Sequence, residues 1–233
     1  MLGYRSALLH SAISREVGII EAMNLTQKQQ DIIVGTLLGD GYLSSNTKNS
    51  HLELKQSDEK KEYVFWLQKG LKNLCTATPK QRRDNNQWYV NTRSSPDLTH
   101  LRSWFYPEGV KIVPSNIEKI LVNPLSLAIW YMDDGTLDYR EKDHYAFRLT
   151  THSFTPSDNQ RLVDVLRGNF GVDATVQSTL IRGKRYPRIH IGVAGRDQFY
   201  NLVHLHILHC FKHKLPPLYL TPQRLGLNDR IAI

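Results

Sequence analysis

Two aspartates in this 233-residue sequence each end a largely apolar stretch and each precede a glycine. Asp40 lies at the end of residues 31–41, and Asp134 lies at the end of residues 125–135. Two carboxylates held close together resist joint ionisation, and a divalent cation relieves their repulsion. All-oxygen ligands favour Mg²⁺, Mn²⁺ or Ca²⁺ over zinc. A pair of such sites suits hydrolysis of a phosphodiester, because bound metal activates water and stabilises the attacking and leaving oxygens.

The residue before each acid differs between the two stretches, being Gly39 in the first and Asp133 in the second. Glycine offers only its backbone, so symmetry does not require the Asp133 side chain. Both residues are candidates to supply a backbone carbonyl to a metal, and the alternative is that Asp133 is a solvated turn residue. A single Asp-Gly pair is common where a helix ends in a turn. Two pairs after similar helices favour the functional interpretation.

The two stretches must be buried helices if they are to position these acids. A helix that is apolar on almost every side has to lie inside the protein. Gly35 and Gly39 are one turn apart, and residues without side chains let another backbone approach closely. We therefore expect the two helices to pack against each other, with Asp40 and Asp134 side by side at one end.

Both helices also carry recognisable start signals. Thr26 followed by Gln29 predicts a capping box for the first helix. Asn123 followed by Pro124 predicts a cap and a first helical position for the second helix.

The order of the predicted elements repeats along the chain. Each unit has the order αββαββα, so we expect an α+β fold built as a pseudo-twofold duplication with the two motif helices on the axis. The expected units are residues 25–122 and 123–217, with an extension over 1–24 and a tail over 218–233. The elements that support this repeat are helices 58–74, 96–105, 115–121, 124–133, 157–169 and 196–211, and strands 51–55, 136–140, 145–151 and the pairs around 84–86 and 182–184.

The charge balance favours a polyanionic partner. The net charge is +8 and the pI is near 9.4, which suits nucleic acid more than other classes of partner. Cys75 and Cys210 lie in apolar patterns and predict buried free thiols, and no Cys/His spacing resembles a zinc site. The apolar runs are too short to span a bilayer, so we expect no membrane partner.

The predicted strands place long polar side chains on one face, and we expect double-stranded DNA to bind there. Antiparallel ribbons fit the major groove, where Arg pairs with guanine and Asn or Gln with adenine. Positive turn residues suit phosphates. The alternative is an ordinary solvated face. The candidate DNA-binding residues are Lys80, Arg82, Gln87, Tyr89, Asn91 and Arg93 in the first half, and Arg148, Thr150, Thr175, Gln177, Thr179, Arg188 and His190, with the turn residues Arg182, Lys184 and Arg185, in the second.

Residues 33–41 and 127–135 resemble the nine-residue signature of LAGLIDADG homing endonucleases. Over residues 25–217 the chain resembles the single-chain, two-motif, intron-encoded members. The resemblance implies a monomer with a saddle-shaped sheet on each side of the motif helices, straddling a long asymmetric DNA site. It implies Mg²⁺-dependent cleavage of both strands across the minor groove, leaving 3′ overhangs. We expect Mn²⁺ to substitute for Mg²⁺, and Ca²⁺ to support binding without cleavage.

The resemblance also implies roles for individual residues. The last acid of each signature, Asp40 or Asp134, corresponds to the metal ligand of the family. Family members place a basic residue near each scissile phosphate, and the Lys-x-x-Pro elements at Lys111 and Lys214 match this pattern; a surface lysine before a turn is the alternative. There it would stabilise developing charge or polarise water.

A polar residue that orders water in the active site is a further feature of the family. Gln56 and His152 share a repeat position in the predicted alignment of the two halves and are the candidates for it. The second motif departs from the signature, with Ile129 in place of Gly and Asp133 in place of a small residue. We therefore expect an asymmetric helix contact in which Gly35 and Gly39 provide the room, and unequal activity on the two strands.

Two other functions fit the same scaffold. One is an RNA maturase that binds intron RNA, and the other is a DNA-binding protein without catalysis. The presence of both acids favours the endonuclease. We expect an intracellular protein of an organelle, either mitochondrion or chloroplast, or of the bacterial cytoplasm, and the sequence does not distinguish these.

Overall fold

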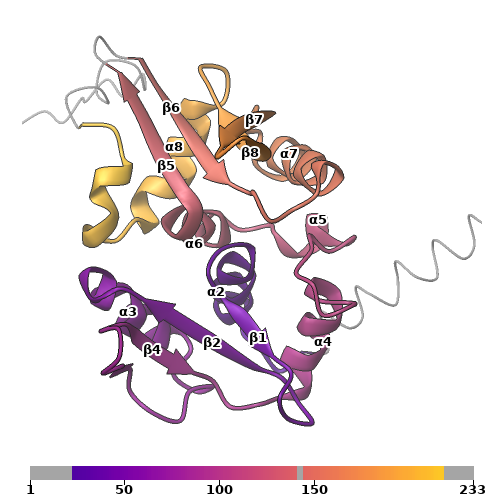
Figure 1. The fold of residues 1–233 in the computed structure, drawn as a ribbon, viewed down its shortest axis with the longest axis vertical. Helices are drawn as coiled ribbons and strands as arrows, with labels where there is room; N and C mark the ends of the chain where they lie inside the picture. Colours follow the sequence, from indigo (N-terminus) through magenta and orange to yellow (C-terminus); the bar gives the residue numbers. More distant parts are fainter. Residues whose placement is uncertain (1–22, 141–143, 218–233) are drawn as a thin grey trace, which may run out of the picture.

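The computed structural model describes residues 23–140 and 144–217. Figure 1 shows two halves stacked on each other, with the helices α2 (Gln27–Leu38) and α6 (Pro124–Asp134) side by side where they meet. The predicted tail and residues 1–22 of the predicted extension lie outside the described residues.

The first half contains one antiparallel sheet with the strand order β1-β2-β4-β3. Its leading helix is followed by β1 (Tyr42–Ser44), β2 (His51–Gln56), the 3₁₀ turn η1 (Asp58–Lys60), α3 (Lys61–Gly70), β3 (Lys80–Gln81), β4 (Trp88–Asn91), α4 (Pro96–Phe105) and α5 (Ile117–Ile120).

The second half has the equivalent strand order, β5-β6-β8-β7, again antiparallel. The predicted α+β duplication is therefore confirmed. After its leading helix come β5 (Gly135–Arg140), β6 (His144–Thr150), α7 (Pro156–Phe170), β7 (Thr175–Ile181), β8 (Lys184–Ile191), α8 (Arg196–Val203), η2 (His204–His206) and η3 (His209–Lys214).

Several predicted helices are shorter in the structure than in the sequence pattern. The helix expected over 58–74 is η1 followed by α3, and the one expected over 115–121 is a single turn. The helix expected over 196–211 ends at Val203 and continues as two 3₁₀ segments, with extended backbone at Ile207. This break turns Phe211 into the core, where its ring centre lies 5.1 Å from that of Tyr63 in the first half.

The contact between α2 and α6 is close and asymmetric, as expected. A Cβ atom at Gly35 would lie 2.6 Å from the carbonyl oxygen of Ser126 and 2.7 Å from Cβ of Ile129. At Gly39 an added Cβ would overlap Cβ of Asp133. Both glycines therefore give room to larger residues of α6. Because successive turns of α2 meet successive turns of α6, the helices run in the same direction and end together.

The start of each motif helix differs in how it is capped. Thr26 and Gln29 form the predicted capping box of α2. Asn123 occupies the N-cap position of α6, but its side chain donates to Oδ1 of Asp31 at 3.0 Å instead of capping its own helix. Ser126 Oγ lies 3.4 Å from the same oxygen. The buried carboxylate of Asp31 thus links α2 to the first turn of α6.

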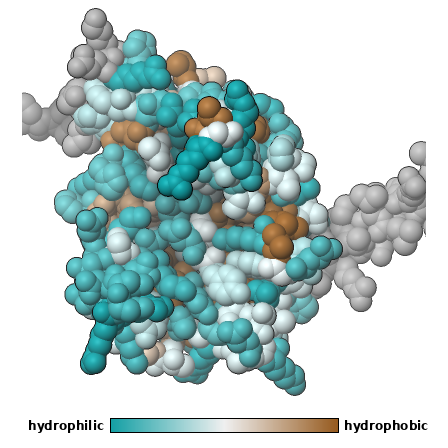
Figure 2. Space-filling view, in the orientation of Figure 1, coloured by the Kyte–Doolittle hydropathy of each residue, from teal (hydrophilic) through white to brown (hydrophobic). Residues whose placement is uncertain are grey.

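Both cysteines are free, with Cys75 buried and Cys210 partly exposed, which corrects the expectation that both thiols are buried. Within the described ranges, no helix combines the length and apolar character needed to cross a membrane. Figure 2 shows that the face seen in Figure 1 is predominantly hydrophilic, with separate small hydrophobic patches.

Candidate active site and DNA-binding faces

The two motif aspartates meet at the shared end of α2 and α6. Asp40 is exposed and comes just after α2, whereas Asp134 is the last residue of α6 and is partly buried. The backbone N–H of Asp40 donates to Oδ2 of Asp133 at 3.2 Å. This hydrogen bond ties the end of one motif helix to the end of the other.

The acids at this end strongly perturb each other. Burial, and next the charge of Asp40, raise the pKa of Asp134 to about 7. Burial and the same charge raise the pKa of Asp133 well above its usual range. The hydroxyl of Tyr63 also faces Asp133, and it makes no hydrogen bond of good geometry within the described residues. Such a cluster resists joint ionisation and favours a bound cation.

These carboxylates fit part of a Mg²⁺ coordination shell. Among residues 23–140 and 144–217, no three His, Cys, Asp or Glu side chains are arranged to hold a metal by themselves. Mg²⁺ takes six oxygen ligands and usually keeps several waters, so Asp40 and Asp134 suffice as protein carboxylates if water and phosphate complete the shell. The Asp133 carboxyl accepts from the backbone N–H of Asp40 and lies 3.5 Å from Gln56 Nε2. The backbone carbonyls of Gly39 and Asp133, the other candidate ligands, face the ammonium groups of Lys111 and Lys214.

The two predicted lysines lie at the ends of the motif helices. Lys111 Nζ donates to the carbonyl oxygens of Gly39 at 2.7 Å and of Gly41 at 3.0 Å. Lys214 Nζ donates to that of Met132 at 2.6 Å, with that of Asp133 at 3.5 Å. Each ammonium group sits at the negative, C-terminal end of a helix. Burial lowers the pKa of both lysines, that of Lys214 to about 8.

The structure brings only one of the two predicted water-ordering residues to the acids. Gln56 Nε2 donates to Oδ2 of Asp40 at 2.8 Å. Tyr42 and Thr136, each the second residue after a motif aspartate, pair with Glu53 and Arg148. The residue three positions further along the strand is Gln56 in the first half, so its counterpart in the second half is Thr151.

The predicted equivalence of Gln56 with His152 is therefore wrong by one residue, and in a strand such a slip reverses the face. Thr151 is buried and donates to Oδ1 of Asn159. The ring of His152 lies 5.3 Å from that of Tyr186 instead.

Lys60 is a site residue that was not predicted from the sequence. It ends η1, and its ammonium group lies 5.4 Å from the centre of the Phe211 ring, while Lys214 Nζ lies 5.2 Å from the same ring. Its charge opposes the rise in the pKa of Asp134 that burial causes, and it adds to the lowering of the pKa of Lys214. A local signal existed, since Lys60 is the N-cap of α3 and a cation is unfavourable at a helix N-terminus.

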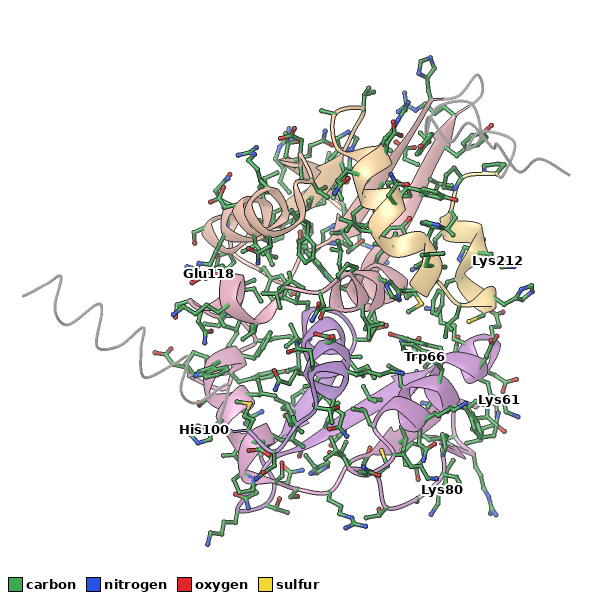
Figure 3. The ribbon with its side chains drawn as sticks, turned by 180° about the vertical axis from the view of Figure 1, so that it is seen from behind. Lys61, Trp66, Lys80, His100, Glu118 and Lys212 are labelled. Atoms are coloured by element: carbon green, nitrogen blue, oxygen red, sulfur yellow. The ribbon has the colours of Figure 1, made fainter. Side chains whose placement is uncertain are left out.

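The exposed face of the first sheet carries the predicted residues Lys80, Tyr89 and Asn91. Tyr89, Asn91 and Arg82 line a hollow of about 310 Å³ on this face. Glu53 and Lys55, which were not predicted, line the same hollow. Lys80 is labelled in Figure 3.

Three other predicted residues lie outside the strands of this sheet. Arg82 and Gln87 belong to the β3–β4 connection, and Arg93 follows β4. Arg82 Nη2 lies 2.7 Å from Oδ2 of Asp84, so this guanidinium already has an ion-pair partner within the protein.

The corresponding face of the second sheet is larger and more cationic. Pairing places all seven predicted strand residues on one face, namely Arg148, Thr150, Thr175, Gln177, Thr179, Arg188 and His190. Four of them line a hollow of about 530 Å³, together with Asp138 and Arg140, which were not predicted.

The β7–β8 hairpin presents the predicted turn residues. Arg182 and Gly183 form a two-residue turn with φ values of 48° and 79°, the left-handed backbone that tight hairpins require. Arg182 and Lys184 are exposed at its tip. Arg185 points to the opposite face from Arg188 by strand alternation, and it donates to Ser178 Oγ at 3.0 Å. Lys184 points to the side of the predicted DNA face, because it lies four residues before Arg188 on the same strand, and Arg185 does not.

Comparison with known proteins agrees with this architecture. Residues 30–199 match the LAGLIDADG DNA endonuclease family. DNA endonuclease I-ChuI of Chlamydomonas applanata is 28% identical over 212 residues, which cover 83% of this chain and 96% of that protein.

Two solved structures share the fold. The homing endonuclease I-WcaI, bound to its DNA recognition sequence, matches with a TM-score of 0.71 and 22% identity, covering 84% of this chain and 89% of that one. I-DmoI in complex with DNA and Mn matches with a TM-score of 0.50 and 16% identity, covering 78% and 99% of the two chains. The family match spans both motifs and both sheets, and the chain belongs to the LAGLIDADG DNA endonuclease family.

Proposed function

We propose that this protein is a site-specific endonuclease that cleaves both strands of a long, asymmetric DNA duplex in the presence of Mg²⁺ and leaves 3′ overhangs. The observation that carries the proposal is the meeting of Asp40 and Asp134 at the shared end of α2 and α6, each with a lysine at the end of its own helix. Similarity to DNA endonuclease I-ChuI, and the DNA and Mn in the I-DmoI complex, support it.

Asp40 and Asp134 would hold the metal, and the other groups would position or support them. A bound divalent cation lowers the pKa of a water ligand and offsets charge on the phosphate. Gln56 orients the Asp40 carboxylate through its hydrogen bond. Lys111 and Lys214 place positive charge beside the acids, where negative charge develops on the phosphate oxygens.

The two polar sheet faces would bind the duplex on either side of the cleavage site. The net charge of +8 supplies attraction to phosphates, and side chains on the strands reach base edges. Because the two faces carry different residues, the two halves of the target should differ. Both motifs lie in one chain, which is consistent with action as a monomer.

A cleavage screen of randomised duplexes tests this function. The wild-type protein should cut a defined subset of duplexes in Mg²⁺ or Mn²⁺, leave 3′ overhangs, and be inactive in excess EDTA. In Ca²⁺ it should bind the selected duplex without cutting it. Cleavage that persists in EDTA, or efficient cleavage in Ca²⁺, would contradict the proposed metal dependence. Absence of any selected duplex in Mg²⁺ would contradict the endonuclease itself.

A further inference from the structure

Two residues of opposite charge occupy equivalent positions in the two sheets. Glu53 pairs with Tyr42, and Arg148 pairs with Thr136. Each pairing partner is the second residue after its motif aspartate, and both charged residues lie on the second strand of their sheet. The pseudo-twofold relation of the halves therefore exchanges a carboxylate with a guanidinium.

The neighbouring strands support this equivalence. On its other side Glu53 pairs with Asn91, and Arg148 pairs with His190. Glu53 and Asn91 line the hollow on the first sheet, and Arg148 and His190 line the hollow on the second sheet. The two surfaces therefore correspond in position, and Glu53 in the first has the opposite charge to Arg148 in the second.

Arg148 is held in a fixed orientation by a carboxylate on the adjacent strand. Its Nη2 donates to Oδ2 of Asp138, and its side chain keeps 26% of its surface exposed. Its Nε is buried and makes no hydrogen bond within the described residues, so the donors left for DNA are those of the two Nη atoms. When a carboxylate fixes the orientation of a guanidinium, the remaining N–H groups lie in one plane and can donate two parallel hydrogen bonds. This geometry matches the O6 and N7 acceptors of guanine.

Glu53 is arranged in the opposite way, as an acceptor between a lysine and a histidine. His51 Nε2 lies 3.4 Å from Oε1 and Lys55 Nζ lies 3.3 Å from Oε2. Its side chain keeps 21% of its surface exposed. An ionised carboxylate accepts hydrogen bonds and donates none, and the base-edge donor it suits in the major groove is the N4 amino group of cytosine.

We propose that Arg148 recognises a guanine and Glu53 recognises a cytosine at the two base pairs related by the pseudo-twofold axis. If the two sheets had the same residue at these equivalent positions, the two related base pairs would be the same and in equivalent orientation. Because Arg148 and Glu53 occupy equivalent positions, they would reach equivalent strands of the duplex, and their opposite charges would select different bases there. The target then departs from twofold symmetry at this pair of positions. The inference rests on the proposed function, and it identifies one pair of positions at which the target is asymmetric.

The test is a binding panel on the duplex selected by the screen, in Ca²⁺, with all four base pairs placed at each position. Wild-type protein should prefer guanine under the second sheet and cytosine at the related position under the first, each by about 10- to 100-fold. Arg148→Gln should lose the first preference, and Arg148→Lys should weaken it, because lysine keeps the charge but not the fork. Glu53→Arg should change the second preference from cytosine to guanine.

Arg182→Gln, at the exposed hairpin tip, is the matched control and should weaken binding equally for every base pair. Thermal unfolding of each variant distinguishes lost recognition from lost folding, and Glu53→Gln provides a milder second variant at that position. The inference is overturned if the two related positions show the same base preference, or if Glu53→Arg changes affinity uniformly. Failure to bind any duplex would instead overturn the proposed function, and the inference with it.

Discussion

The ends of the two motif helices have the same parts but different surroundings. Asp40 is exposed and accepts a hydrogen bond from Gln56, whereas Asp134 is partly buried, with its pKa raised to about 7. The residue before the acid is Gly39, just after α2, in the first half and Asp133, within α6, in the second. The duplication therefore preserves the position of the acid and of the lysine, while the network around them is one-sided.

The reason for this difference lies in the packing of the helices. Gly39 has no side chain, so Asp133 fits against it and its carboxyl reaches the backbone N–H of Asp40. No such contact can form in the other direction, because Gly39 offers nothing to Asp134. The backbone is therefore pseudo-twofold, whereas the charges and hydrogen bonds around the two aspartates are not related by the twofold axis. Substitutions at each end test how far the two ends differ.

Among the substitutions that compare the two ends, the largest effect is expected for the lysines that both ends share. Lys111→Met and Lys214→Met should each slow cleavage about 100-fold, since each removes a cation beside developing charge, and binding should change by less than about threefold. Lys212→Met, an exposed neighbour labelled in Figure 3, is the control and should change neither. The measurement is single-turnover cleavage with binding in Ca²⁺. A loss of affinity alone would make these lysines phosphate anchors.

Packing between the helices gives the next effect. Gly35→Ala would place Cβ against the backbone oxygen of Ser126, which cannot move aside, and should lower the free energy of unfolding by about 2–3 kcal/mol. Gly168→Ala in α7 is the matched control, because no atom beyond its chain neighbours and its own helix backbone lies within 4 Å of an added Cβ, and it should raise stability by about 0.5–1 kcal/mol. Thermal or denaturant unfolding measures both. Equal stabilities would mean that the helices do not cross so closely.

Gln56 tests the one-sided network directly. Gln56→Leu removes the donor to Asp40 and should slow cleavage of one strand about tenfold, with the other strand changed by less than about threefold. Thr151→Val alters the equivalent position, which faces Asn159 and not the acids, and should leave the ratio of the two rates unchanged. Duplexes labelled separately on each strand give these rates. Equal slowing of both strands would argue against a one-sided role.

The smallest effect is on the pH dependence of stability without metal. Folded Asp134 keeps its proton up to about pH 7, whereas the unfolded side chain loses it near the ordinary aspartate pKa of 3.8. The folded state therefore binds more protons between these values, so the free energy of unfolding falls as pH rises from about 4 to 7. Asp134→Asn should flatten this fall by about 1–2 kcal/mol. An unchanged pH profile of Tm in EDTA would contradict the raised pKa.

Much of this architecture follows from short-range sequence patterns. Apolar character, glycines one turn apart and paired acids predicted the α2–α6 contact, because backbone approach is limited only by the side chains at the crossing. Strand alternation placed Tyr89, Asn91 and Arg188 on the polar faces. These inferences succeed since period and residue size act locally.

The errors arose where long-range contacts or exact register decide. A one-residue slip assigned His152 to the position that Thr151 occupies. Exact strand register also decides that Arg185 points away from the face that carries Arg188. Lys60 was missed because its importance depends on Phe211, from the other half of the molecule. Burial of that same ring against Tyr63 also explains why the helix expected over 196–211 breaks.

The central claim is that Asp40 and Asp134 together make the site that cuts both strands. The most direct measurement is double-strand cleavage of the selected duplex in Mg²⁺ by Asp40→Asn and Asp134→Asn, with binding measured in parallel and Asp164→Asn, an exposed acid of α7, as control. We predict that each motif variant loses double-strand cleavage while binding stays within about tenfold, because phosphate contacts carry much of the affinity, and that the control behaves as wild type. Double-strand breaks at the wild-type rate by either motif variant would contradict the claim.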